Sequence, residues 1–119
     1  QLNVMGLVAT IAAYKFGDER FNGVFNYIKN NVEYIKSYVE TNLPTVRMIN
    51  HEATYLVWLD FRGLGLTPAQ LEDAIINKSK LWLDSGKIFG ASGEGFQRIN
   101  AACPRRTLEE AMARLTLII

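Results

Sequence analysis

The sequence predicts an α/β (α+β) domain in which helices pack on one face of a small mixed or antiparallel sheet of about four strands. Three observations lead to this fold class. In the first half of the chain, apolar residues recur every three or four positions over a long stretch, as in an amphipathic helix. Short apolar segments bounded by Gly and Pro follow, as in strands. Helix-start signals occur between and after these segments, so helices and strands are mixed along the chain.

Length and composition limit the possible functions. The chain has 119 residues, which is enough for one small domain with a core and too few for two. A net charge of +1 and dispersed basic residues argue against nucleic acid or an anionic membrane surface as a partner. No apolar run approaches the roughly 20 residues that cross a bilayer. The lone cysteine, Cys103, cannot form an internal disulfide or a cysteine-rich metal site, so we expect a cytoplasmic protein.

Two helices are expected at the start of the chain. The first spans residues 2–14, which are rich in Ala, Leu, Val and Met, and it begins as if already under way. Gly17 interrupts it, and Asp18 is expected to cap the second helix. Pro44 ends this long second helix. Its apolar face is formed by Phe21, Val24, Phe25, Ile28, Val32, Ile35, Val39 and Leu43.

Four strands are expected, at residues 46–49, 53–61, 80–83 and 96–103. Apolar side chains occupy both faces of the second strand, so both faces should be covered at least in part. One layer of helices in a chain this short is not expected to cover both, which indicates that neighbouring structure is missing. Residues 84–86 are expected to form a turn.

Two further helices follow from capping boxes. Thr67, Pro68 and Gln70 place a capping box and a proline at the first helical position, and the helix should run to about Asn77. A second capping box at residues 107–110 should open the last helix.

Arg98, inside the last expected strand, is the most specific candidate for a binding residue. A guanidinium held by a strand can bind a carboxylate through two parallel hydrogen bonds. The alternative is a surface arginine on an edge strand, paired or solvated, and the local sequence leaves both open. The glycine-rich residues 90–95 come before a strand and not before a helix, so they are interpreted as a turn and not as a phosphate loop.

The remaining polar candidates do not complete a catalytic set. His51 is the only histidine and has no evident partner, so it is interpreted as a loop residue. Cys103 is interpreted as a small buried residue and not as a nucleophile. Turn chemistry explains Asp84 and Ser85 without catalysis. Tyr55 is typical of a buried strand, although it could line a site.

Three motifs, in order, resemble a known family. Residues 51–60, 86–90 and 93–105 are similar to the C-terminal part of pyridoxal-phosphate-dependent class I/II aminotransferases. They most resemble the cystathionine β-lyase (C-S lyase) branch of the MalY/PatB type, and the resemblance covers essentially the whole chain. It implies the fold type I architecture of these transferases, assembled as a homodimer. Residues 1–16 would be a helix belonging to or leading from a missing large cofactor domain, and residues 17–119 would be the C-terminal small domain.

The resemblance also implies roles for individual residues. Arg98 would bind the α-carboxylate of an amino-acid substrate. Apart from the resemblance, Tyr55, Phe89 and Asn100 are candidates for lining the pocket. The resemblance places no catalytic, cofactor-binding or metal-binding residue in this chain, because none of its lysines sits in the motif of the Schiff-base lysine. Pyridoxal 5'-phosphate would be bound by the full-length parent and not by this fragment, which should therefore be inactive alone.

The resemblance favours a parent lyase that converts its substrate by β-elimination to a thiol, ammonia and pyruvate. Three alternatives stay open at this point. The parent could be an aminotransferase of class I/II. The chain could instead be a stand-alone module that binds carboxylates without catalysis, or a structural or regulatory dimerisation domain.

Overall fold

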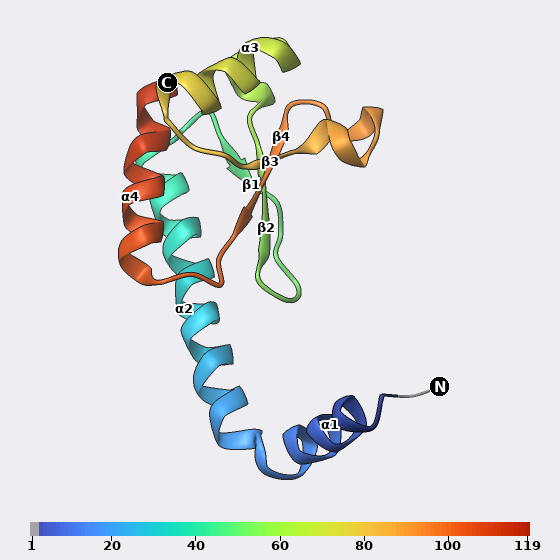
Figure 1. Ribbon diagram of the computed structural model, residues 1–119. Helices are drawn as coiled ribbons and strands as arrows, with labels where there is room; N and C mark the ends of the chain where they lie inside the picture. Colours follow the sequence, from blue (N-terminus) through green and yellow to red (C-terminus); the bar gives the residue numbers. More distant parts are fainter. Residues whose placement is uncertain (1–2) are drawn as a thin grey trace.

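Two helices at the start of the chain meet at a glycine and point in different directions (Figure 1). The computed structural model describes residues 3–119, in which α1 (Val4–Phe16) is followed by α2 (Asp18–Asn42). The expected start of the first helix, Leu2, lies outside the described residues. The expected cap by Asp18 is wrong, because Asp18 is already helical and Gly17 precedes it without a side-chain cap. The long second helix is confirmed, but only the second half of its apolar face is buried, because Phe21, Val24 and Phe25 are exposed.

A four-stranded antiparallel sheet follows, as expected. Its strands are β1 (Arg47–Met48), β2 (Leu56–Asp60), β3 (Asp84–Ser85) and β4 (Phe96–Asn100), in the spatial order β1-β2-β4-β3. β4 therefore lies between two strands. The interpretation of Arg98 as an edge-strand residue is thereby excluded.

The third strand does not form where the sequence predicts it. Residues 80–83 are irregular, and the pairing with β4 is made by Asp84–Ser85, which were expected to be a turn. Lys80 has a positive φ of 53°, and this breaks the extended backbone at the start of the expected strand. The last strand ends at Asn100 and not at Cys103, because the side-chain oxygen of Asn100 accepts a backbone N–H two residues further on.

The two later helices are present with shifted bounds. α3 (Pro68–Asp73) opens with the expected capping box at Thr67 and continues as a π-helical turn to Lys78. α4 (Arg105–Leu115) begins ahead of Thr107, so the second expected capping box is wrong.

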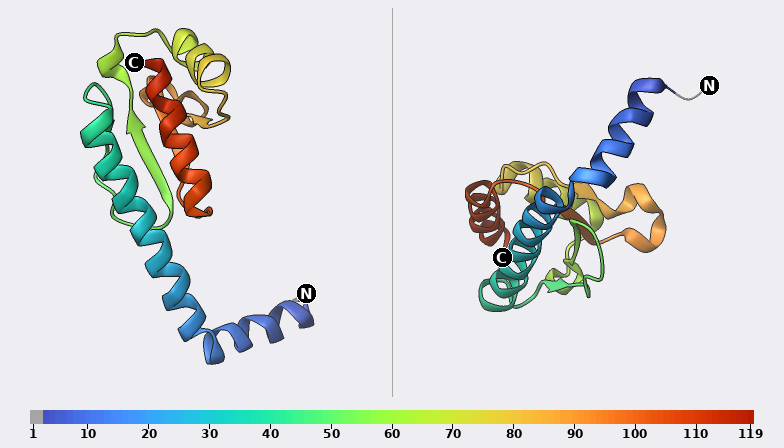
Figure 2. Two further views of the ribbon diagram at one scale, coloured as in Figure 1. Left: turned by 90° about the vertical axis from the view of Figure 1, so that its left-hand side faces the viewer. Right: turned by 90° about the horizontal axis from the view of Figure 1, so that it is seen from below.

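Helices α2 and α4 lie side by side over one face of the sheet, which confirms the expected layer arrangement (Figures 1 and 2). β2 directs Val57 and Leu59 into this layer, and both side chains have no exposed surface. The core between sheet and helices is formed mainly by Val32, Ile35, Val39, Leu43, Val57, Leu59, Phe61, Leu71, Ile75, Ile99, Leu108, Met112 and Leu115.

The short turns between β3 and β4 cover part of the opposite face of the sheet. These turns, Gly86–Phe89 and Ala91–Gly93, project to the side away from α2 and α4 (Figure 1). They fold tightly, since a Cβ at Gly86 would lie 2.0 Å from the carbonyl oxygen of Gly93. The glycine-rich turn is confirmed, and its position brings Phe89 against the sheet.

Helix α1 stands away from the sheet and the other helices (Figure 2). None of its residues is buried, and its exposed side chains include Met5, Tyr14 and Phe16. Among the described residues, no helix combines the length and the apolar character needed to cross a membrane.

Candidate functional site

Arg98 lies at the middle of β4, on the face that points away from the helices. Its neighbours in the strand, Gln97 and Ile99, are buried in the helix-covered face. On the adjacent strand its register partner is Trp58. The Arg98 side chain is 24% exposed, so the guanidinium is partly enclosed and still accessible.

An aspartate holds one edge of the guanidinium. The Nε–H and an Nη2–H of Arg98 both donate to Oδ2 of Asp84, at 3.1 and 2.7 Å. Asp84 is also the register partner of Arg98 between β3 and β4. An arginine offers five N–H donors, so donors on Nη1 and Nη2 remain beyond this ion pair.

A row of aromatic rings supports the arginine from one side. The Cζ atom of Arg98 lies 4.6 Å from the ring centroid of Phe89, which is a cation–π distance. The ring of Trp58 meets Phe89 edge-on at 5.2 Å and Phe96 at 6.2 Å between centroids. At the far end, Arg62 places its Cζ 4.6 Å from the centroid of Phe96. The guanidinium of Arg98 is therefore packed against Phe89, which in turn contacts Trp58.

A shallow groove of about 350 Å³ runs along the same aromatic row. Its walls include Trp58, Phe89 and Phe96, so Phe89 contributes both to the groove and to the contact with Arg98. Arg98 itself does not line this groove and is connected to it through Phe89. Fixed N–H donors next to an apolar surface suit a small molecule that carries one carboxylate and a less polar remainder.

A second charged cluster holds the far end of the row. Asp60 is 6% exposed and accepts from Arg62 through Nε at 2.9 Å and Nη2 at 2.8 Å, and from Nη2 of Arg47 at 3.2 Å. The hydrogen bonds from Arg62 lower the pKa of the Asp60 carboxyl to about 2. Asp60 stays ionised at neutral pH and fixes Arg62 over Phe96.

Of the expected pocket-lining residues, only Phe89 is seen in contact with Arg98. Asn100 lies two residues further along the same face of β4, where its side-chain oxygen is engaged by the N–H of Ala102. Tyr55 precedes β2 and is 43% exposed, so it is not the buried strand residue that the sequence indicates.

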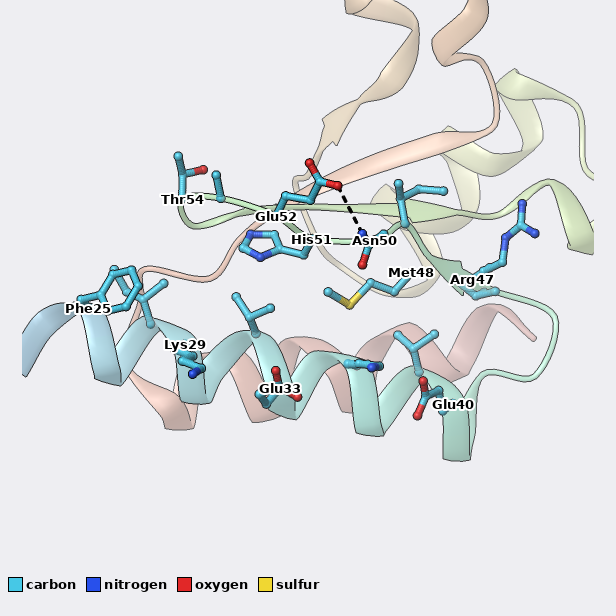
Figure 3. A pocket seen from close by; sticks show the side chains of 17 residues that line it. Phe25, Lys29, Glu33, Glu40, Arg47, Met48, Asn50, His51, Glu52 and Thr54 are labelled. Atoms are coloured by element: carbon cyan, nitrogen blue, oxygen red, sulfur yellow. Dashed lines mark hydrogen bonds between the residues drawn. The ribbon is translucent and has the colours of Figure 1, made fainter.

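His51 lies in the loop between β1 and β2, as expected, and lines a different groove of about 550 Å³ against α2. Figure 3 shows Lys29 and Glu33 of α2 across from His51 and Met48. The nearby hydrogen bond from Asn50 to Glu52, at 3.4 Å, stays within the loop. Arg98 does not line this groove.

The structure offers little for metal or thiol chemistry. Within residues 3–119, no group of three or more His, Cys, Asp or Glu side chains is placed to hold a metal ion. Burial raises the pKa of the Cys103 thiol, which disfavours the thiolate that a nucleophile needs. The thiol is partly buried, close to the expectation of a small buried residue.

No family model matches the chain, but curated proteins and solved structures do. Cystathionine β-lyase PatB of Bacillus subtilis (strain 168) is 37% identical over 114 residues, which are 96% of this chain and 30% of that protein. Protein MalY of Escherichia coli (strain K12) is 36% identical over 113 residues, which are 95% of this chain and 29% of that protein. The crystal structure of cystalysin from Treponema denticola, which contains a pyridoxal 5'-phosphate cofactor, matches with a TM-score of 0.91 at 33% identity. This match covers 99% of this chain and 30% of that one.

The chain corresponds to the C-terminal domain of cystathionine β-lyases and related enzymes of the aminotransferase fold. This confirms the expected family resemblance and the expected fold. The domain spans about 30% of the length of the curated relatives it matches.

Within this cystathionine β-lyase-type domain, sequence reasoning missed Asp84 and Trp58 as neighbours of Arg98. The sequence Asp84-Ser85-Gly86 is typical of a turn, which is why Asp84 is expected to be a turn residue. The sequence does indicate a strand, a glycine-rich connection and then β4, so some residue before the connection must lie opposite Arg98. Which residue that is depends on the pairing register, and the sequence does not give it.

Proposed function

We propose that this domain supplies the carboxylate-binding part of an enzyme acting on amino acids, with Arg98 as the residue that binds the α-carboxylate. The observation that carries the proposal is the partly enclosed guanidinium of Arg98, which keeps N–H donors beyond its ion pair and packs against Phe89. Phe89 also lines an apolar groove. A carboxylate bound by two such donors is fixed in orientation as well as in place.

For the parent enzyme we propose a pyridoxal-phosphate-dependent carbon–sulfur lyase of the cystathionine β-lyase type. The names of the relatives and the high structural similarity to cystalysin support this proposal. When bound, pyridoxal phosphate supplies the electron-withdrawing group that weakens bonds at the substrate Cα. Within this reaction, the domain binds the substrate carboxylate and thereby orients the Cα substituents. The products would be a thiol, ammonia and pyruvate.

The residues of this domain do not by themselves fit the cofactor. The groove beside Arg98 has no lysine among its lining residues. Lys87, in the adjacent turn, pairs with Glu72 through a 2.6 Å contact between Nζ and Oε2. We therefore expect the purified 119-residue chain to show no lyase activity with added cofactor and L-cystathionine. Product formation by the chain alone would contradict this.

The exposed apolar side chains of α1 support a further proposal about domain organisation. Because no residue of α1 is buried, we propose that residues 1–16 belong to or lead from the large cofactor domain, and that residues 17–119 form the small domain. We also propose that the parent is a cytoplasmic homodimer. Light scattering of the full-length protein would give its oligomeric state, and fractionation of the source cell would give its location.

Arg98→Lys in the full-length enzyme tests the proposed function. Lysine keeps the positive charge but loses the planar bidentate geometry. We expect kcat/KM to fall by about 10- to 100-fold, the equivalent of roughly 1.5–3 kcal/mol, while the cofactor absorbance stays unchanged. An unchanged kcat/KM would contradict the role of Arg98. Product analysis on the same samples separates a lyase from an aminotransferase. A lyase releases pyruvate and ammonia, whereas an aminotransferase releases the oxo acid that keeps the whole side chain of the substrate.

A further inference from the structure

The ion pair between Asp84 and Arg98 determines which part of the guanidinium is available to a ligand. Both hydrogen bonds go to one oxygen, Oδ2 of Asp84, and they come from Nε and Nη2. Nε and Nη2 form the lateral edge of the planar guanidinium, next to the aliphatic part of the side chain. The outer side, formed by Nη1 and the second Nη2 hydrogen, makes no hydrogen bond within residues 3–119.

Two contacts therefore fix the plane of the guanidinium. Asp84 holds one side of it in the plane, and the ring of Phe89 covers one of its faces at 4.6 Å. Without Asp84, the long Arg98 side chain would regain rotamer freedom, and a bound carboxylate would have to supply that order.

We propose that Asp84 is a positioning residue for carboxylate recognition: it orients Arg98 so that the outer Nη1–Nη2 side is presented to the substrate. The inference rests on the proposed function of Arg98 and deepens it. Asp84 does not touch the substrate in this account and acts through Arg98.

The pair is unlike a structural ion pair of the core. The Asp84 side chain is 49% exposed, and exposed ion pairs contribute little to folding. Removing the Asp84 carboxylate should therefore leave the domain folded, so its effect on substrate binding can be measured separately. Glu72 provides a matched control. It forms a similar ion pair with Lys87, in the turn that carries Phe89, and has no contact with Arg98 in the described part of the chain.

The test uses the full-length enzyme and two probes, L-alanine and L-alaninamide, which differ only in the carboxylate. Titration of each probe gives a dissociation constant, and their ratio measures carboxylate selectivity. For Asp84→Ala we expect selectivity to fall about tenfold through weaker L-alanine binding, with alaninamide unaffected. Asp84→Asn keeps an acceptor oxygen for the same two N–H groups, so it should stay within about threefold of the wild type. Glu72→Ala should match the wild type.

The possible failures are distinguishable. If Arg98→Ala abolishes selectivity while Asp84→Ala keeps it, the inference about Asp84 falls and the function of Arg98 stands. If Asp84→Ala weakens both probes equally, its role is structural and the inference also falls. If Arg98→Ala leaves carboxylate selectivity unchanged, both the proposed function of Arg98 and the inference about Asp84 are wrong.

Discussion

Asp60 offers a test of the charged cluster that holds one end of the aromatic row. In Asp60→Asn, the carboxylate that accepts from Arg62 and Arg47 becomes a neutral amide. Asp60 also accepts the backbone N–H of Arg62 at 3.1 Å, so it orders the turn that follows β2. We expect the substitution to destabilise the domain at neutral pH.

The magnitude follows from the pKa of Asp60. The hydrogen bonds from Arg62 lower this pKa from 3.8 to about 2 in the folded protein. At about 1.4 kcal/mol for each pH unit, the ionised carboxylate stabilises the fold by at most about 2.5 kcal/mol. Because the folded-state pKa is the lower one, this stability is fully present above about pH 4. It is lost as the pH falls through about 2.

Urea denaturation of the wild type and Asp60→Asn, at pH 7 and at stepwise lower pH, would measure this difference. The stability deficit of the variant should reach at most about 2.5 kcal/mol at pH 7 and should shrink as the pH approaches 2. Glu94→Gln is the control, since Glu94 is exposed and makes no ion pair among the described residues. Equal stability of Asp60→Asn and the wild type at pH 7, or a deficit that does not change with pH, would refute the reasoning.

Two other substitutions test the packing around the site. Asn31 is fully buried, and its Nδ2 donates to two backbone carbonyls after β4 at 2.8 and 2.9 Å. Asn31→Ala should therefore cost about 2–3 kcal/mol in urea denaturation, and a loss below about 0.5 kcal/mol would contradict this account. Gly86→Ala would place a Cβ 2.0 Å from the Gly93 oxygen and should displace the turn that carries Phe89. We expect weaker amino-acid binding by the full-length variant, and unchanged affinity would show that the turn does not support Arg98.

The sequence predicts those elements whose signals are local. The 3.6-residue period of α2 and the capping box at Thr67 need no distant partner, and both are confirmed. Short apolar segments bounded by turn residues locate β2 and β4. Their ends shift because Thr54 has a φ of 67° and Asn100 turns the chain with its side chain. Arg98 was identified for the same reason: one charged side chain in an apolar strand is visible without knowledge of the fold.

The partners of Arg98 depend on how β4 pairs with β2 and β3, and local sequence patterns do not reveal this pairing register. Asp84 and Arg98 are brought together by a connection with two short helical turns and with positive φ at Gly90 and Gly95. A shift of one residue would direct Asp84 to the other face of the sheet. For the same reason, the packing of Phe89 against Arg98 and its edge-on contact with Trp58 are findings of the structure.

The most direct test of the central claim is a crystal structure of the full-length enzyme with a bound amino-acid inhibitor. This account predicts that the inhibitor carboxylate accepts hydrogen bonds from Nη1 and Nη2 of Arg98, at about 2.7–2.9 Å. Asp84 should keep its contacts with Nε and Nη2. A carboxylate bound by other residues, with Arg98 paired only to Asp84, would contradict the account.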